Sequence, residues 1–115
     1  RLVDQGVICV SEGANMPSDL DAIKVYKENG IFYGPAKAAN AGGVAVSALE
    51  MSQNSLRLSW TREEVDGRLK DIMTNIFNTA KTTSETYGLD KDYLAGANIA
   101  AFENVANAMI AQGIV

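Results

Sequence analysis

Residues 12–17, with the sequence EGANMP, combine residue types that can bind a ligand. Gly13 and Ala14 leave peptide groups open to close approach, and Asn15 offers both a hydrogen-bond donor and an acceptor. A ribose or a carboxamide would suit such a segment. The alternative is a plain strand-to-helix turn, with Gly13 at a positive φ and Asn15 bonded to its own backbone. On local evidence alone, the turn is the simpler interpretation.

A second segment, residues 40–47 with the sequence NAGGVAVS, could bind an anion. A glycine pair that opens a helix leaves free N–H groups at the positive end of the helix dipole. Val44 and Ser47 are three residues apart and share a helix face, so they could hold a ligand with an aliphatic part and a polar end. The simpler alternative is that Asn40 caps the helix and Ser47 is a buried serine bonded to a carbonyl one turn back.

Three further observations limit the chemistry of the chain. Glu12 could act as a general base, but no second titratable group lies near it in the sequence. Lys37 is a cation in a loop of small residues, and a solvated lysine is its simplest interpretation. The G-x-G-x-x-G fingerprint of pyrophosphate binding is absent. We therefore assign Glu12 and Lys37 structural roles.

The composition excludes several kinds of site. The 115 residues contain no histidine, so Ser-His-Asp and Cys-His devices and His-ligated metal sites are excluded. Cys9 is the only cysteine, so neither an internal disulfide nor a Cys-cluster metal site is possible; it also favours a reduced, cytoplasmic location. A net charge of −4 argues against nucleic acid as a partner, and no apolar run of about 18 residues predicts a membrane span.

The first third of the chain has the pattern of a βαβ unit. Residues 6–10 are short, apolar and β-branched, which predicts a strand buried on both faces, as in a parallel sheet. Ser18 and Asp21 resemble a capping box, and the helix that follows should stop near residues 29–30. Residues 31–33 predict a second strand. Strand, helix and strand with short links form an α/β unit.

The rest of the chain is predicted to be helical. Residues 36–43 are small and are expected to be flexible, and a helix that Asn40 or Gly42 could cap follows at about 43–58. Thr61 and Glu64 form a capping box before an amphipathic helix that should end at Gly88. A final helix should end at Gly113. Its apolar positions are Ile99, Phe102, Val105, Ala106, Met109 and Ile110.

Five segments taken together resemble one family of enzymes. They are SEGANMP (11–17), GPAKAANAGGV (34–44), SALEMSQN (47–54), GANIA (96–100) and AMIAQGIV (108–115). In order and spacing they resemble the C-terminal part of the hexameric glutamate dehydrogenases of bacteria and fungi. The related leucine, phenylalanine and valine dehydrogenases share the Asn-Ala-Gly-Gly element, but they usually lack its flanking motifs.

The resemblance implies both a fold and an activity. Residues 1–43 would end a Rossmann-like NAD(P)-binding domain, and residues 44–115 would be C-terminal helices that pack between the two domains of a longer chain. The chain begins with Arg1, which is consistent with such a piece. The implied reaction is the reversible oxidative deamination of L-glutamate to 2-oxoglutarate and ammonium, with NADP or NAD as coenzyme. The family's catalytic lysine and aspartate would lie upstream.

The resemblance also implies roles for particular residues. Asn15, with the backbone of Gly13 and Ala14, matches the position that meets the nicotinamide ribose. Asn40 matches the asparagine that bonds the nicotinamide carboxamide. For Asn40, and also for Val44 and Ser47, the resemblance favours the ligand-binding interpretation over the purely local one.

Two further matches concern the substrate. Val44 matches an apolar wall of the substrate pocket, and Ser47 matches the serine that bonds the side-chain carboxylate of glutamate. The partners implied are the rest of the same chain and further copies in a homohexamer. Two alternatives stay open, namely a free-standing, non-catalytic α/β binding module and a related branched-chain amino-acid dehydrogenase.

Overall fold

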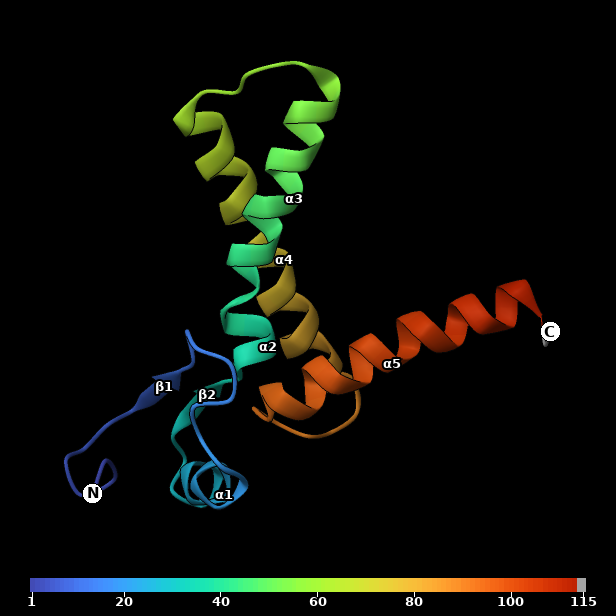
Figure 1. The fold of residues 1–115 in the computed structure, drawn as a ribbon. Helices are drawn as coiled ribbons and strands as arrows, with labels where there is room; N and C mark the ends of the chain where they lie inside the picture. Colours follow the sequence, from blue (N-terminus) through green and yellow to red (C-terminus); the bar gives the residue numbers. More distant parts are fainter. Residues whose placement is uncertain (114–115) are drawn as a thin grey trace.

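The computed structural model describes residues 1–113, which are mostly helical with a small parallel sheet (Figure 1). The elements in chain order are β1 (Cys9–Ser11), α1 (Leu20–Glu28), β2 (Phe32–Gly34), α2 (Ala36–Ala39), α3 (Ala41–Leu56), α4 (Arg62–Thr86) and α5 (Tyr93–Gln112). None of these helices is long and apolar enough to cross a membrane.

The predicted strand-helix-strand order is confirmed. β1 and β2 pair in parallel, with Cys9 opposite Phe32 and Ser11 opposite Gly34. The buried core beside this sheet is small and is built by Tyr26, Ile31 and Tyr33, with Val3, Val10, Ala22, Ile23 and Leu94 packed against it. The pairing of the two strands therefore places the segments that follow them beside each other.

The predicted burial of the first strand on both faces is wrong for the part of the chain that the structure describes. Val10 packs against the core, but Ile8 is 79% exposed and Cys9 is exposed as well. A strand of this kind needs cover on both faces, and residues 1–113 cover it on one.

The start of α1 differs from the predicted Ser18–Asp21 capping box. Asp19 is the N-cap, and its side chain accepts the backbone N–H of the residue three positions later at 2.8 Å. The backbone N–H of Ser18 is instead donated to Glu12. The predicted stop is confirmed, because Gly30 follows the C-cap with φ of +67°.

The predicted start and end of α4 and the predicted end of α5 are confirmed. Thr61 and Glu64 form a complete capping box at the start of α4, and Gly88, with φ of +66°, follows its C-cap. Asp92 caps the start of α5 with its side chain, and Gly113 caps its end. These signals are local, so they do not depend on the rest of the fold.

Residues 36–43 are helical except at Asn40, and the prediction of a flexible segment is wrong. Pro35, with φ of −65°, precedes α2, and α3 begins at Ala41 rather than at about Gly43. Alanine is the best helix former and proline is well suited to a helix start, which explains why this alanine-rich stretch folds. Asn40 lies between α2 and α3 and occupies the predicted N-cap position of α3, but its side chain forms no capping hydrogen bond.

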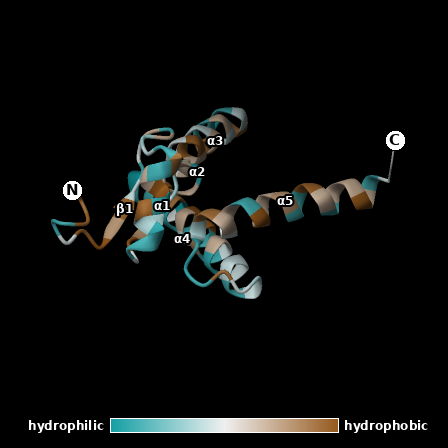
Figure 2. Ribbon diagram, turned by 90° about the horizontal axis from the view of Figure 1, so that it is seen from below, coloured by the Kyte–Doolittle hydropathy of each residue, from teal (hydrophilic) through white to brown (hydrophobic). Residues whose placement is uncertain are grey.

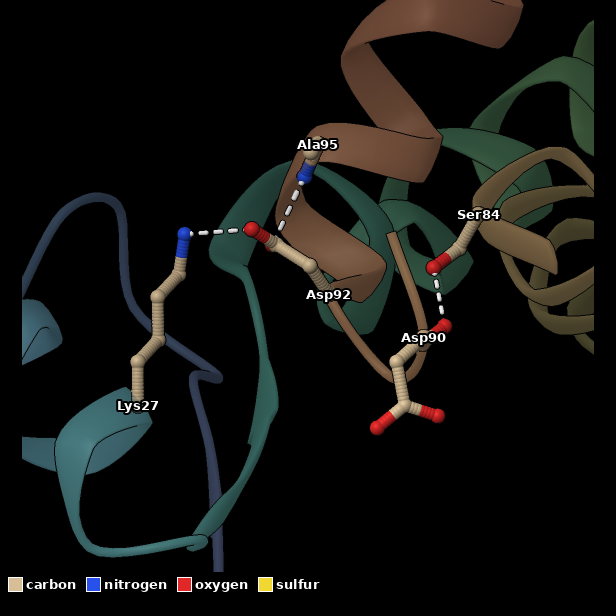
Figure 3. A network of polar contacts seen from close by, with 5 residues as sticks. All are labelled: Lys27, Ser84, Asp90, Asp92 and Ala95. Carbon is tan, nitrogen blue, oxygen red and sulfur yellow. Dashed lines mark hydrogen bonds and ion pairs between the residues drawn. The ribbon is translucent and has the colours of Figure 1, made fainter. Parts of the chain in front are cut away.

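A polar network joins the βαβ unit to the helices (Figure 3). Lys27 on α1 forms an ion pair with Asp92 at 2.7 Å, and Asp92 accepts the backbone N–H of Ala95 at 3.0 Å. The Ser84 hydroxyl, which is fully buried, donates to the backbone carbonyl of Asp90. The loop between α4 and α5 is therefore held from both sides.

The helices leave much apolar surface uncovered. α3 and α4 lie against each other as a hairpin, and α5 extends away from the body of the molecule (Figure 1). Hydrophobic positions run along α5 towards its far end (Figure 2), where Phe102, Val105, Met109 and Ile110 are 61–79% exposed. The residues within 1–113 do not cover this face.

Candidate functional site

The two segments singled out in the sequence meet in the structure. The side-chain amide of Asn40 donates to the side-chain oxygen of Asn15 at 2.7 Å, although 25 positions separate them. Asn15 lies in the loop after β1, and Asn40 follows β2 through α2. The carboxyl ends of parallel strands lie at the same edge of a sheet, where ligands of open α/β sheets bind.

The simple turn interpretation of residues 12–17 is wrong in both of its details. Asn15 bonds to Asn40 rather than to its own backbone, and Gly13 does not have a positive φ. Met16 takes the left-handed conformation instead, with φ of +51°. Gly13, Ala14 and Asn15 are all exposed, so their polar groups are accessible to a ligand.

Asn40, Val44 and Ser47 follow one face of α3. Their spacing of four and then three residues places them one above another on a helix. Val44 is 75% exposed, and Ser47 is exposed too. The Ser47 hydroxyl donates to the carbonyl of Gly43 at 3.2 Å, as the local alternative predicted, but the serine is not buried. This long bond and open position leave the hydroxyl free to turn towards a ligand.

Glu12 is a buried carboxylate that bonds three groups. Its side chain is 3% exposed; Oε1 accepts the backbone N–H of Ser18 at 3.1 Å, and Oε2 accepts the Tyr33 hydroxyl at 2.7 Å and the backbone N–H of Ala36 at 3.0 Å. The predicted structural role is compatible with these bonds. The sequence did not reveal these bonds, because Tyr33 is 21 positions away from Glu12. They become predictable only once the strand register, which pairs Val10 with Tyr33, is known.

These contacts shift two pKa values in opposite directions. Burial by itself raises the pKa of Glu12, but the hydrogen bonds from Tyr33, Ser18 and Ala36 outweigh it and hold the pKa below 4.5. Burial, together with the hydrogen bond and the negative charge of Glu12, raises the pKa of Tyr33 well above its usual range. At neutral pH the pair is therefore a carboxylate and a protonated phenol.

Glu12→Gln is expected to remove part of the protein's sensitivity to acid. A carboxyl whose pKa is lowered by folding stabilises the protein above its unfolded pKa, and this contribution is lost as the pH falls through the folded pKa. The difference in unfolding free energy between the wild-type protein and the variant should therefore shrink below pH 4.5. Urea denaturation between pH 7 and about pH 3 measures it. Equal pH slopes in the two proteins would contradict the assignment.

Lys37 has a partner that its sequence position did not suggest. It lies on α2, and its ammonium group donates to the side-chain oxygen of Asn98 on α5 at 2.5 Å. The side chain stays exposed, as expected of a solvated lysine. α2 is thus linked at Lys37 to α5 and at Asn40 to the loop after β1.

An apolar cavity of about 510 Å³ lies beside the sheet. It is lined by residues of the two strands, of α2 and of α4, together with Tyr93. None of the six residues predicted to contact a coenzyme or a substrate lines it. Residues 1–113 also hold no group of three or more Cys, Asp or Glu side chains placed to bind a metal ion.

Comparison with known proteins gives a consistent result. Residues 1–113 match the family model described as Glutamate/Leucine/Phenylalanine/Valine dehydrogenase. The chain is 58% identical over 115 residues to the NADP-specific glutamate dehydrogenase of Giardia intestinalis, and 48% identical to that of Escherichia coli (strain K12). Each of these two matches covers all of this chain but only 26% of the relative's length.

Comparison with solved structures points to the same family as comparison of the sequences. The crystal structure of Plasmodium falciparum glutamate dehydrogenase superimposes on 99% of this chain and 25% of that one, with a TM-score of 0.94 and 54% identity. The chain therefore belongs to the glutamate/leucine/phenylalanine/valine dehydrogenase family.

Proposed function

We propose that this chain is the part of an NAD(P)-dependent glutamate dehydrogenase that holds the nicotinamide and the substrate side chain. The complete enzyme would interconvert L-glutamate with 2-oxoglutarate and ammonium. The observation that carries the proposal is the 2.7 Å hydrogen bond between Asn15 and Asn40, at the head of the helix face that bears Val44 and Ser47. The identity of 48–58% to enzymes named as glutamate dehydrogenases supports the choice of substrate.

The two asparagines have the right groups for the nicotinamide end of the coenzyme. Because Asn15 accepts from the amide nitrogen of Asn40, the amide plane of Asn40 is fixed and its oxygen remains available as an acceptor. That oxygen would accept a carboxamide N–H, and Asn15 with the exposed peptide groups of Gly13 and Ala14 would meet the ribose. When bound, NAD or NADP supplies the hydride acceptor.

Val44 and Ser47 would bind the side chain of the substrate. Val44 would contact the methylene groups of glutamate, and the Ser47 hydroxyl would leave the carbonyl of Gly43 and donate to the distal carboxylate. The general acid and base are proposed to lie outside these 115 residues. No histidine is needed, which agrees with a sequence that has none.

We also propose how the chain fits into the complete enzyme. Residues 1–43 would be the last part of a Rossmann-like coenzyme domain, and residues 44–115 would pack between that domain and the substrate domain. The exposed apolar side chains of Ile8, just before β1, and of α5 support this assignment, because residues 1–113 do not cover them. The complete enzyme is proposed to be a homohexamer.

The isolated 115-residue chain is expected to show no glutamate-dependent reduction of NAD or NADP, and the complete protein is expected to show it. The reason is that the general acid and base are proposed to lie outside these 115 residues. Coenzyme reduction is followed by its absorbance, with leucine, phenylalanine and valine tested beside glutamate. A preference for leucine or valine would move the proposal to the branched-chain enzymes. A native gene product of only 12.3 kDa would favour the non-catalytic module.

A further inference from the structure

We propose that Glu12 is the residue that positions the nicotinamide-binding pair, by fixing Asn15 relative to Asn40 through its buried carboxylate. The inference rests on the proposed function, because it concerns the same two asparagines. It adds a residue that makes no contact with the coenzyme itself. Glu12 would act through the loop on one side and through α2 on the other.

The two oxygens of Glu12 bond to two different segments. Oε1 accepts the N–H of Ser18, at the far end of the loop that carries Asn15. Oε2 accepts from Tyr33 on β2 and from Ala36, the first residue of α2. The backbone N–H of Glu12 also donates to the carbonyl of Gly34 at 3.0 Å. One side chain thus joins the β1–α1 loop to the β2–α2 junction.

These contacts restrict both asparagines over short spans of chain. Asn15 is three residues from Glu12 and three from Ser18, so its loop is closed at both ends by the same carboxylate. Asn40 lies one turn after Ala36, and its backbone N–H donates to the carbonyl of Ala36 at 2.9 Å. Any displacement at Glu12 is therefore passed to both sides of the 2.7 Å bond between the asparagines.

The arrangement of donors around Glu12 requires a carboxylate at this position. The carboxylate is buried and forms no ion pair with a side chain of residues 1–113, so its three neutral donors must hold it. A glutamine of the same shape has one oxygen and one NH₂ group. In either orientation, its NH₂ group would face a backbone N–H, that of Ser18 or that of Ala36. The loop or α2 must then move away.

The test compares Glu12→Gln with the wild type in the complete enzyme. We expect kcat to fall at least about tenfold, because small displacements of reacting groups are costly in hydride transfer. KM for glutamate should stay within about twofold, since Ser47 lies two turns further along α3. The primary isotope effect with glutamate deuterated at C2 should rise as hydride transfer becomes the slow step.

Glu64→Gln is the matched control. Glu64 also accepts a backbone N–H, at 2.7 Å from Thr61, and the pKa of its carboxyl is also lowered by that contact, but it is exposed at the start of α4. Its kcat and isotope effect are expected to equal those of the wild type. Tyr33→Phe is a milder second variant, which removes one donor and keeps the carboxylate. It should change the same quantities in the same direction, by a smaller factor.

The outcomes separate the two proposals. A fall in kcat with an unchanged isotope effect, in Glu12→Gln or in Tyr33→Phe, would mean fewer active molecules and would overturn the positioning role. Unchanged kinetics in both variants would overturn it as well, while the proposed function would stand on the wild-type activity. A wild-type protein without glutamate-dependent coenzyme reduction would instead defeat the proposed function.

Discussion

Gly96→Ala is expected to destabilise the protein by about 3 kcal/mol, the upper end of the usual cost of overpacking. A Cβ atom at position 96 on α5 would lie 2.1 Å from the carbonyl oxygen of Ala80 on α4 and 3.1 Å from Cβ of Ser84. The nearest obstacle is backbone, so no side-chain rotation relieves the clash. The two helices would have to separate where Gly96, Ala80 and Ser84 are all buried.

Gly67→Ala is the matched control for this prediction. Gly67 lies within α4, and a Cβ atom there would meet no other atom within 4 Å. Because alanine is the better helix former, this variant is expected to gain about 1 kcal/mol. Urea denaturation of the three proteins measures both effects as shifts of the midpoint. Equal stabilities of the two variants would show that α4 and α5 are not in such close contact.

Much of the fold follows from short-range signals in the sequence. The capping box of Thr61 and Glu64, and the glycines that follow α1 and α4, fix helix ends with groups a few residues apart. Those predictions are confirmed because nothing distant competes with them. The prediction for residues 36–43 is wrong because small side chains do not by themselves make a segment flexible, and alanine after proline favours helix.

The contacts that define the candidate site could not be derived in the same way. The bonds from Asn40 to Asn15 and from Tyr33 to Glu12 span 25 and 21 positions, and they depend on the parallel register of β1 and β2. Local patterns predict a plain turn at Asn15, which is wrong, and an N-cap at Asn40, which is right in position although the side chain bonds to Asn15 instead of capping α3. The prediction that Ile8 is buried is wrong for another reason, because no residue within 1–113 covers that side chain.

The identity of the ligands rests on a different kind of inference. Exposed peptide groups, an asparagine pair and a hydroxyl beside a valine specify hydrogen-bonding capacity, and many small molecules satisfy it. The motifs spread from residue 11 to residue 115 are what narrowed the ligand class, and the match of residues 1–113 to the family model confirms the family. The geometry then limits which residues can act together, because Asn40, Val44 and Ser47 share one helix face.

Ser47→Ala in the complete enzyme is expected to lower kcat/KM for glutamate roughly ten- to hundredfold. Loss of one hydrogen bond to a charged group costs about 1.5–3 kcal/mol, and in this proposal Ser47 donates to the distal carboxylate. The fold should be unaffected, because the hydroxyl is exposed and its bond to the carbonyl of Gly43 is 3.2 Å long. Initial rates over a range of glutamate concentrations give the value.

Ser52→Ala separates this loss from a general effect on α3. Ser52 is an exposed serine of the same helix, and its hydroxyl donates to the carbonyl of Ala48 at 2.9 Å, one turn back, as that of Ser47 does to Gly43. Five residues further on, it faces another direction, so its variant should keep the wild-type kcat/KM. Norvaline, which has no distal carboxylate, serves as a second substrate that tests whether the effect of Ser47→Ala depends on that carboxylate. If Ser47 binds that carboxylate, Ser47→Ala should leave the norvaline rate unchanged, whereas equal losses with both substrates would remove the serine from this role.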